Sequence, residues 1–242
     1  MVIAIQTINL TKEFKNRTAV DSLNLSIEKG ELFALLGLNG AGKTTTIKML
    51  CGLLSPTSGD AVLLGDSIVE HPTAVKQKIN LSPQETAVAP KLSVQENLEL
   101  IARIYGSNKR EARSKTDAVM QAFGLSDRSK EKAKTLSGGL QRRLSIAMAL
   151  ISDPEIIFLD EPTLGLDVVA RRELWKIMRG LKGRITMVLT THYLEEAEAL
   201  SDRIGIMHDG RLKALGTAEQ LKQETGTTSF EEAFLALTET EV

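Results

Sequence analysis

The sequence contains a single cysteine, Cys51, among 242 residues. A lone cysteine excludes an internal disulfide framework. Its place in an apolar segment indicates a small buried side chain rather than a nucleophile. Such a chain suits a reducing compartment.

Long apolar runs are also missing. None approaches the roughly 18 residues that a membrane-spanning helix requires. The start, Met-Val-Ile-Ala-Ile-Gln-Thr, lacks the charged segment and the long apolar stretch of a secretory leader. We therefore expect a cytoplasmic protein, which another protein must hold in place if it works at a membrane.

Neither sign of charge is in excess. The 30 lysines and arginines oppose 31 aspartates and glutamates, for a formal net charge of -1. Because binding to nucleic acid depends on a basic surface excess, we expect no nucleic-acid partner. The 42% apolar and 25% charged residues are typical of a soluble globular protein. The length suits one large domain, or one domain with a lobe inserted into it.

The order of the expected elements indicates an α/β protein. A β-rich start is predicted, with strands at 2–5, 23–27 and 32–36, helix 43–53 and a hairpin at 62–68. Residues 86–152 are expected to be mainly helical, with helices at 97–105 behind a Ser93-x-x-Glu96 capping box, at 109–123 and at 138–151. Beyond Pro154 the strands 156–159, 185–190 and 204–207 alternate with helices 169–180 and 194–200, and further helical segments follow at 218 and 229–237. Strands that alternate with helices predict a parallel sheet.

The segment 37–45 has the P-loop pattern between a strand and a helix. Its glycines let backbone N–H groups converge on phosphates at a helix N-terminus. Lys43 is expected to reach the β- and γ-phosphates, and the Thr44 hydroxyl to bind Mg²⁺. The nucleotide-binding residues predicted here are Gly37, Leu38, Asn39, Gly40, Ala41, Gly42, Lys43, Thr44 and Thr45.

Two acids follow the apolar run 156–159. Asp160 is predicted to hold Mg²⁺ through water, as the aspartate that partners a P-loop does. Glu161 would lie toward the γ-phosphate, where it could orient and polarise the attacking water. Adjacent acids at a strand end could instead cap a helix or be solvated, but with a P-loop present they favour ATP hydrolysis.

These motifs resemble, in order and spacing, the ATP-binding subunits of ABC transporters, and the resemblance covers essentially the whole chain. The residues that carry it are 37–45, Gln84 in Leu81-Ser82-Pro83-Gln84, the signature Leu136-Ser137-Gly138-Gly139, Asp160-Glu161, Leu166-Asp167 and Thr190-Thr191-His192. The resemblance implies one ABC-type P-loop ATPase domain, 1–242, with an N-terminal antiparallel β part. Its divisions would be an α/β core (1–85 and 153–215), a helical signature part (86–152) and a helical tail (216–242).

The resemblance also explains why the chain has a second glycine-rich turn. In the family two such domains stack head to tail, and the signature of one closes on the γ-phosphate bound by the other. Ser137, Gly138 and Gly139 would therefore serve the ATP of a second subunit. An isologous pair of this kind makes two equivalent ATP sites, and we expect a homodimer.

Other roles are implied residue by residue. Phe14 matches the aromatic that stacks on adenine, although a single N-terminal phenylalanine is more often a core residue. Gln84 resembles the glutamine that touches Mg²⁺ and moves with the membrane partner. Asp167 resembles the aspartate that crosses the dimer interface, and His192 the histidine that contacts the γ-phosphate and Glu161.

The sequence departs from the family pattern at two positions. Leu140 stands where many members have glutamine, which affects only the contacts that glutamine would make. Val168 follows Asp167 where proline is frequent, a difference that we expect to loosen that turn. Both departures leave the expected catalytic groups, Glu161, His192 and Lys43, in place.

The function implied is that of an ATPase subunit, using ATP and Mg²⁺, in a multi-subunit transporter. Its permease subunits would be separate chains that bind the segment from Gln84 through the helical part and hold the ATPase at the inner face of the cell membrane. The pattern at 161–167 and 192–198 resembles the branch that exports drugs, sodium or glycoconjugates. An importer ATPase and a soluble ABC ATPase acting on ribosomes or DNA are the alternatives.

Overall fold

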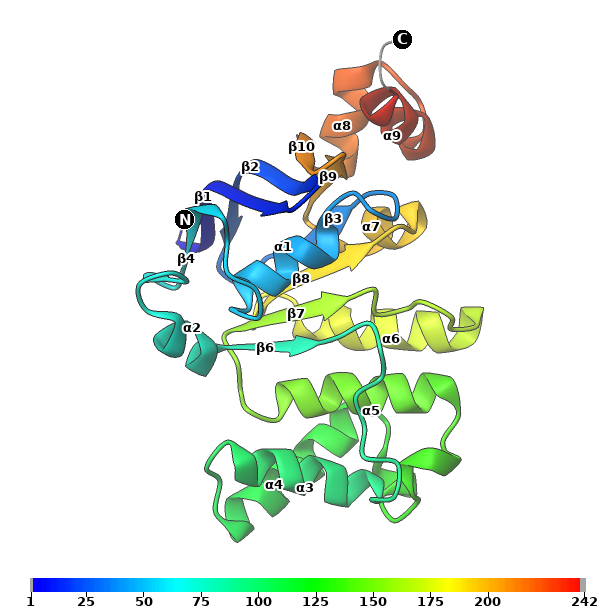
Figure 1. Ribbon diagram of the computed structural model, residues 1–242. Coiled ribbons are helices and arrows are strands. Elements are labelled where there is room, and N and C mark those ends of the chain that lie inside the picture. The colour runs from blue at the N-terminus through cyan, green and yellow to red at the C-terminus, as the bar shows by residue number, and fades with distance from the viewer. Residues whose placement is uncertain (1, 240–242) are drawn as a thin grey trace.

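The computed structural model describes residues 2–239, which form two sheets and the helices around them (Figure 1). The larger sheet has six strands in the order β10-β9-β3-β8-β7-β6. All neighbouring strands in it are parallel except β9 and β10. Its strands are β3 (Leu32–Leu36), β6 (Ile79–Ser82), β7 (Ile156–Asp160), β8 (Thr186–Thr191), β9 (Arg203–His208) and β10 (Arg211–Gly216).

The central strands are apolar on both faces because both faces are covered. Leu32, Ala34 and Leu36 belong to one buried cluster, whereas Phe33 and Leu35 belong to another. The first cluster includes side chains from α5 (Gly138–Leu150), α6 (Val168–Leu181) and α7 (Leu194–Leu200). The second is covered by α1 (Lys43–Leu50) and the smaller sheet. The prediction of a parallel α/β core is confirmed.

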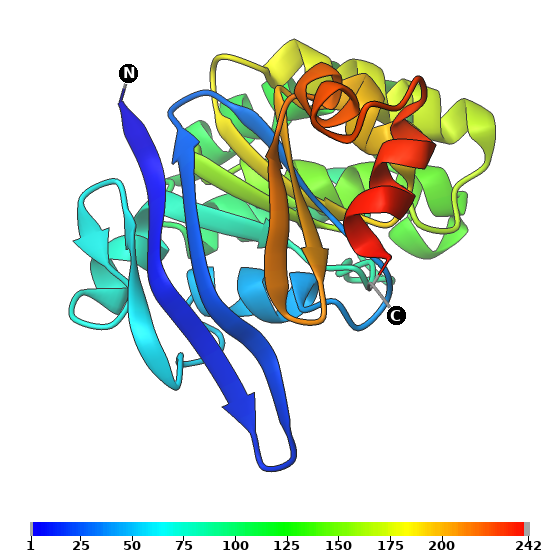
Figure 2. The same ribbon diagram turned by 90° about the horizontal axis from the view of Figure 1, so that it is seen from above.

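The smaller sheet is antiparallel, with the strand order β2-β1-β4-β5. Its strands are β1 (Ile3–Phe14), β2 (Arg17–Glu28), β4 (Ser58–Leu63) and β5 (Asp66–Ser67). Figure 2 shows β1 and β2 as two long neighbouring strands beside the larger sheet. The predicted strands at 2–5 and 23–27 were too short, because the outer face of this hairpin is polar and breaks each apolar run.

The helical part lies at one end of the molecule, below β6 in Figure 1. Its elements are α3 (Val94–Ile104), α4 (Lys109–Ala122), the 3₁₀ turns η1 (Ser126–Arg128) and η2 (Ala133–Thr135), and α5. The capping box predicted at Ser93 is present, since Ser93 Oγ accepts from Glu96 N and the Glu96 carboxylate accepts from Ser93 N. Leu144 and Ile151 are buried, as the helical spacing of apolar residues in α5 predicts.

Two helix predictions need correction. Helix α1 ends at Leu50 rather than at Leu53, because Gly52 takes a positive φ of 63° and turns the chain. Helix α2 (Pro72–Lys78) was not predicted; it is short and begins with a proline at its first turn, where proline is tolerated.

The chain continues past β10 with α8 (Ala218–Thr225) and α9 (Phe230–Thr238), which lie over β9, β10 and α7 (Figure 1). Phe230 and Phe234 bury their side chains there. The predicted tail runs to residue 242, and residues 240–242 lie outside the described residues. Within residues 2–239 no helix combines the length and the apolar character needed to cross a membrane.

Candidate active site

The phosphate loop connects the end of β3 to α1. Two of its positions must be glycine because backbone atoms of other segments lie too close for a side chain. A Cβ on Gly37 would lie 2.3 Å from the carbonyl oxygen of Met207, and one on Gly42 would lie 2.4 Å from that of Ala19. Gly42 is also the N-cap of α1, with φ at 105°, a conformation that only glycine adopts without strain. The loop therefore presents bare backbone at a helix N-terminus, which favours an anion.

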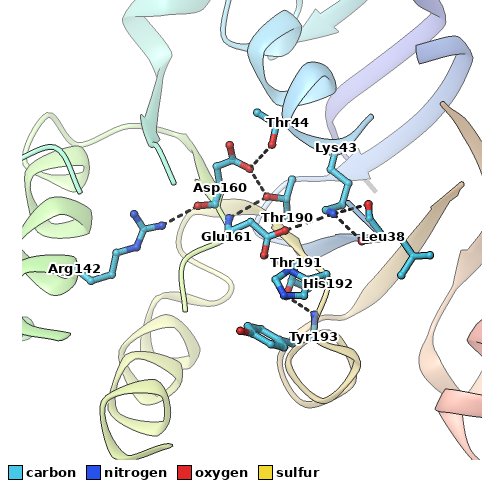
Figure 3. A network of polar contacts seen from close by, with 11 residues as sticks. Leu38, Lys43, Thr44, Arg142, Asp160, Glu161, Thr190, Thr191, His192 and Tyr193 are labelled. Carbon is cyan, nitrogen blue, oxygen red and sulfur yellow. Dashed lines mark hydrogen bonds and ion pairs between the residues drawn. The ribbon is translucent and has the colours of Figure 1, made fainter. Parts of the chain in front are cut away.

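Lys43 joins the loop to the end of β7. Its Nζ lies 2.7 Å from Gly37 O, 3.2 Å from Leu38 O and 3.4 Å from Glu161 Oε1 (Figure 3). The lysine is only 5% exposed. The positive charge of Lys43 therefore lies beside the carbonyl oxygens of the phosphate loop.

Asp160 lies beneath the loop, at the last position of β7. One of its oxygens, Oδ1, accepts from Thr44 Oγ1 at 3.1 Å and from Thr190 Oγ1 at 2.5 Å (Figure 3). Since β7 and β8 are parallel neighbours, their carboxyl ends bring Asp160 and Thr190 side by side. A hydroxyl and a carboxylate thus meet at one point, and both are oxygen donors that suit Mg²⁺.

Glu161 is the next residue, and its backbone takes an unusual conformation. Its φ is 47°, in the left-handed region that favours glycine. Its N–H donates to both the carbonyl oxygen and the hydroxyl of Thr190, at 3.2 and 3.0 Å. Its Oε2 lies 2.8 Å from His192 Nδ1. Such conformations cost about 1–3 kcal/mol and persist where the surroundings enforce them, often at functional sites.

Lys43, Thr44, Glu161 and His192 line one cavity of about 410 Å³, whereas the predicted site residues Gly37, Leu38 and Asp160 do not line it. It is lined by Phe14, Arg17, Ala19, Asn39, Gly40, Ala41, Gly42, Lys43, Thr44, Thr45, Gln84, Glu161, Leu164 and His192. Phe14 is half exposed at the end of β1, so a core role for it is wrong. The structure therefore brings together the phosphate loop, Phe14, Gln84, Glu161 and His192 from distant parts of the sequence.

The signature residues and Asp167 do not line this cavity. Ser137 and Asp167 instead cap helices α5 and α6, accepting from Leu140 N at 3.4 Å and from Ala170 N at 2.9 Å. A Cβ added at Gly138 would meet no atom within 4 Å, so packing inside the chain does not account for glycine there. Ser137 and Gly138 of the signature turn are exposed.

Sequence reasoning assigned no individual role to Arg17, Thr190 or Arg142. Arg17 lines the cavity and donates from Nη2 to Gly40 O. Thr190 holds both Asp160 and the Glu161 amide. Arg142 reaches the end of β7 from α5 (Figure 3). Thr190 belongs to the Thr190-Thr191-His192 motif, but the sequence alone does not give its hydrogen-bond partners. The same holds for Arg142, an arginine that follows a glycine turn.

A buried carboxyl, that of Glu196, lies near Glu161. Glu196 on α7 is fully buried, and its Oε1 accepts from Trp175 Nε1 at 3.1 Å. Burial raises the pKa of this carboxyl, while the nearby hydroxyls of Thr191 and Thr163 and the Trp175 N–H act in the opposite direction. The negative charge of Glu161 also raises the pKa of this carboxyl, which does not line the cavity.

The fold and the cavity define a P-loop nucleoside triphosphatase. Comparisons with known proteins give its family. The family model described as ABC transporter matches residues 20–164. The chain is 42% identical over 224 residues to the daunorubicin resistance ATP-binding protein DrrA3 of Streptomyces coeruleorubidus, an alignment that covers 92% of this chain and 71% of the relative.

Two solved structures agree. One, of an ATP-binding subunit of an ABC transporter, matches with a TM-score of 0.86 at 29% identity, covering 98% of this chain and all of that one. The other is a dimeric post-hydrolysis state of the ATP-binding cassette MJ0796 bound to ADP and Pi, with a TM-score of 0.79, 27% identity and coverage of 88% and 98%. The chain belongs to the ABC transporter family; it is an ATP-binding subunit that hydrolyses ATP. Subunits of this kind form dimers and work with membrane partners.

Proposed function

We propose that this chain is the ATPase subunit of an exporter, and that it acts as a homodimer on separate permease subunits at the inner face of the cell membrane. The observation that carries the catalytic part is the position of Glu161 between Lys43 and His192 in one cavity. The relative that is named for daunorubicin resistance supports export. The importer alternative keeps the same site and differs in the permease.

In the proposed mechanism Glu161 accepts a proton from the attacking water. His192, bonded to Oε2, fixes the carboxylate so that Oε1 is left toward the phosphates. Lys43, whose Nζ lies 3.4 Å from Glu161 Oε1, offsets the charge of the γ-phosphate. A positioned base of this kind contributes about 10²–10⁴-fold in rate.

The remaining binding roles follow the cavity wall. Phe14 offers its exposed ring to adenine, and Asn39 to Gly42 with Thr44 and Thr45 offer backbone and hydroxyl donors to the phosphates. Gly37 and Leu38 support the loop by holding Lys43 Nζ at their carbonyls.

Mg²⁺ fits the donors at the base of the cavity. Thr44, Asp160 and Gln84 provide hydroxyl, carboxylate and amide oxygens, and Thr44 and Asp160 already lie 3.1 Å apart at Oγ1 and Oδ1. When bound, the ion would offset the negative charge of the phosphates. In the part of the chain that the structure describes, no three histidine, cysteine, aspartate or glutamate side chains gather as metal ligands.

The second copy would supply Ser137, Gly138 and Gly139 to the γ-phosphate, with Asp167 at the interface. The open space at Gly138 and the exposed Val168 and Val169 at the start of α6 support this face as the contact. Two copies arranged head to tail would complete two sites.

The permease would contact α3 and the segment that follows Gln84. Leu100 and Ile104 are exposed one turn apart on α3, 44% and 67% accessible, beside Glu96, Glu99 and Arg103. An apolar strip with a charged rim suits a helix from another subunit.

We also propose the division into an α/β core (1–85 and 153–215), a helical signature part (86–152) and a tail (216–242).

The proposal is tested by the solution mass of Glu161→Gln with and without ATP and Mg²⁺, together with its turnover. We expect ATP to bind, the mass to double and turnover to fall at least about 10²-fold. Turnover equal to that of the parent would overturn the role of Glu161. A monomer with ATP bound would overturn the autonomous homodimer and direct the search to a different ATPase partner or to the permease.

A further inference from the structure

Arg142 is a buried cation that no carboxylate contacts directly. It lies in the second turn of α5, five residues after Ser137, and is 4% exposed. Among residues 2–239 no salt bridge includes it, whereas the adjacent Arg143 pairs with Glu173 of α6. Burial lowers the pKa of the Arg142 guanidinium to about 10, against the attraction of Asp160 and Glu196.

Among the described residues the guanidinium bonds only to backbone carbonyls, and these belong to two different segments. Nε donates to Pro162 O and Nη2 to Asp160 O, both at 2.9 Å. Nη1 donates to Pro83 O and, at 3.3 Å, to Gln84 O. One side chain therefore joins the segment that contains Gln84 to the two residues that flank Glu161.

Glu161 is thus fixed from both sides. Its own amide is held by Thr190, and the carbonyls before and after it are held by Arg142. Its φ of 47° needs such support. Lysine could not replace this arrangement, because an ammonium is a single point of charge, whereas the planar guanidinium presents donors along two edges.

We propose that Arg142 is a positioning residue, which holds the Glu161 and Gln84 segments at one fixed place relative to the signature turn. Arg142 does not line the cavity, and it acts through Glu161. Because Ser137 and Arg142 share one helix, the surface offered to a second copy and the chain's own catalytic carboxylate would move as one unit. This inference rests on the role proposed for Glu161.

The test is a double-substitution cycle in the full-length protein, with Arg142→Lys, Glu161→Gln and the double variant. Displacement of a catalytic group by about 1 Å can cost on the order of 10²-fold. We therefore expect Arg142→Lys to lower kcat at least about tenfold, while the Kd for ATP changes less than about threefold. In the Glu161→Gln background the same change should lower the residual rate less than about threefold, because residues that act as a unit are not additive.

The matched control is Arg143→Lys, which weakens the contact between α5 and α6 but leaves both segments bonded. Its kcat should stay within about twofold of the parent. Amide exchange gives a second readout: Arg142→Lys should speed exchange at 81–86 and 160–165 and leave α2 unchanged.

Three results would overturn the inference: a parent-like kcat for Arg142→Lys, an equal loss of rate in both backgrounds, or a protein that fails to fold or exchanges faster throughout. The last would assign Arg142 to the stability of the fold alone. Parent-like turnover of the single variant Glu161→Gln would instead refute the proposed function, so the two failures are distinguishable.

Discussion

Glu161 and His192 lie 31 residues apart in the sequence, and yet Glu161 Oε2 is 2.8 Å from His192 Nδ1. The contact exists because β7 and β8 are parallel neighbours and each residue follows the carboxyl end of its strand. A ligand site at this edge of a parallel sheet is general for open α/β folds. Here Lys43 lies at the same edge, so that a carboxylate, an imidazole and an ammonium group face one cavity.

Loss of the His192 side chain should slow ATP hydrolysis but leave the affinity for ATP unchanged. His192→Ala removes the contact that orients the Glu161 carboxylate, and we expect kcat to fall about 10²–10³-fold, the range for a lost preorganised partner. Steady-state turnover and equilibrium binding of ATP measure the two effects. His71→Ala, at the exposed start of α2, is the control. A parent-like kcat in His192→Ala would contradict the prediction.

The close approach at Gly42 should be essential to the phosphate loop. Gly42→Ala would place a Cβ 2.4 Å from Ala19 O at a φ of 105°, so the loop must shift, and we expect ATP binding to be lost. Gly65→Ala is a matched control, because φ there is also positive, at 90°, but no atom lies within 4 Å of the added Cβ. It should cost about 1 kcal/mol of backbone strain and bind ATP normally. Calorimetry and thermal unfolding distinguish the two, and equal behaviour would show that strain alone matters.

Phe14 should contribute to affinity rather than to stability. The ring is half exposed, with Lys12 Nζ 5.4 Å from its centroid. Phe14→Ala should weaken ATP binding by about 0.5–1.5 kcal/mol, the size of an aromatic stacking contact, and leave the unfolding temperature and the saturated rate near those of the parent. Phe14→Trp should retain affinity. Unchanged affinity in the alanine variant would remove the adenine contact from the proposal.

Glu196 should make stability depend on pH. Burial raises its pKa in the folded protein above the ordinary 4.5, so the folded state binds more protons than the unfolded state between these two values. Its contribution to the free energy of unfolding is therefore largest below pH 4.5 and declines as pH rises through the raised pKa. Arg142 and Glu161 are the charged groups nearby.

Glu196→Gln tests this directly, because a glutamine oxygen can still accept from Trp175 Nε1. The stability of the variant relative to the parent should rise with pH across that window, as measured by urea unfolding at several pH values. A constant difference would contradict the raised pKa. Trp175→Phe, which removes the donor at every pH, should destabilise the protein more evenly.

The parts of the fold that could be predicted are those with local patterns. The phosphate loop, the apolar strand before Asp160 and the helix cap at Ser93 each depend on neighbours in sequence, and all are present. The pairing of Glu161 with His192 depends on strand order, which no local pattern encodes; it was expected only through the family resemblance. The contact is confirmed, whereas its role in catalysis stays a prediction.

Arg142 shows why the rest could not be predicted. In the sequence it is one of two adjacent arginines after a glycine turn, and either could be a solvated residue. Successive residues of α5 point in different directions, so Arg142 lies toward the sheet and Arg143 toward α6. Its partners are carbonyls, which every residue has, so no side-chain pattern in the sequence marks them.

The single cysteine has a practical consequence. Cys51 is 6% exposed, and burial raises the pKa of its thiol, so little thiolate is available to reagents. A cysteine introduced at Val169, which is 67% exposed at the start of α6, would be the one readily labelled site in an otherwise native background. Spin labels or fluorophores attached there would report the distance between two copies as ATP is bound and hydrolysed.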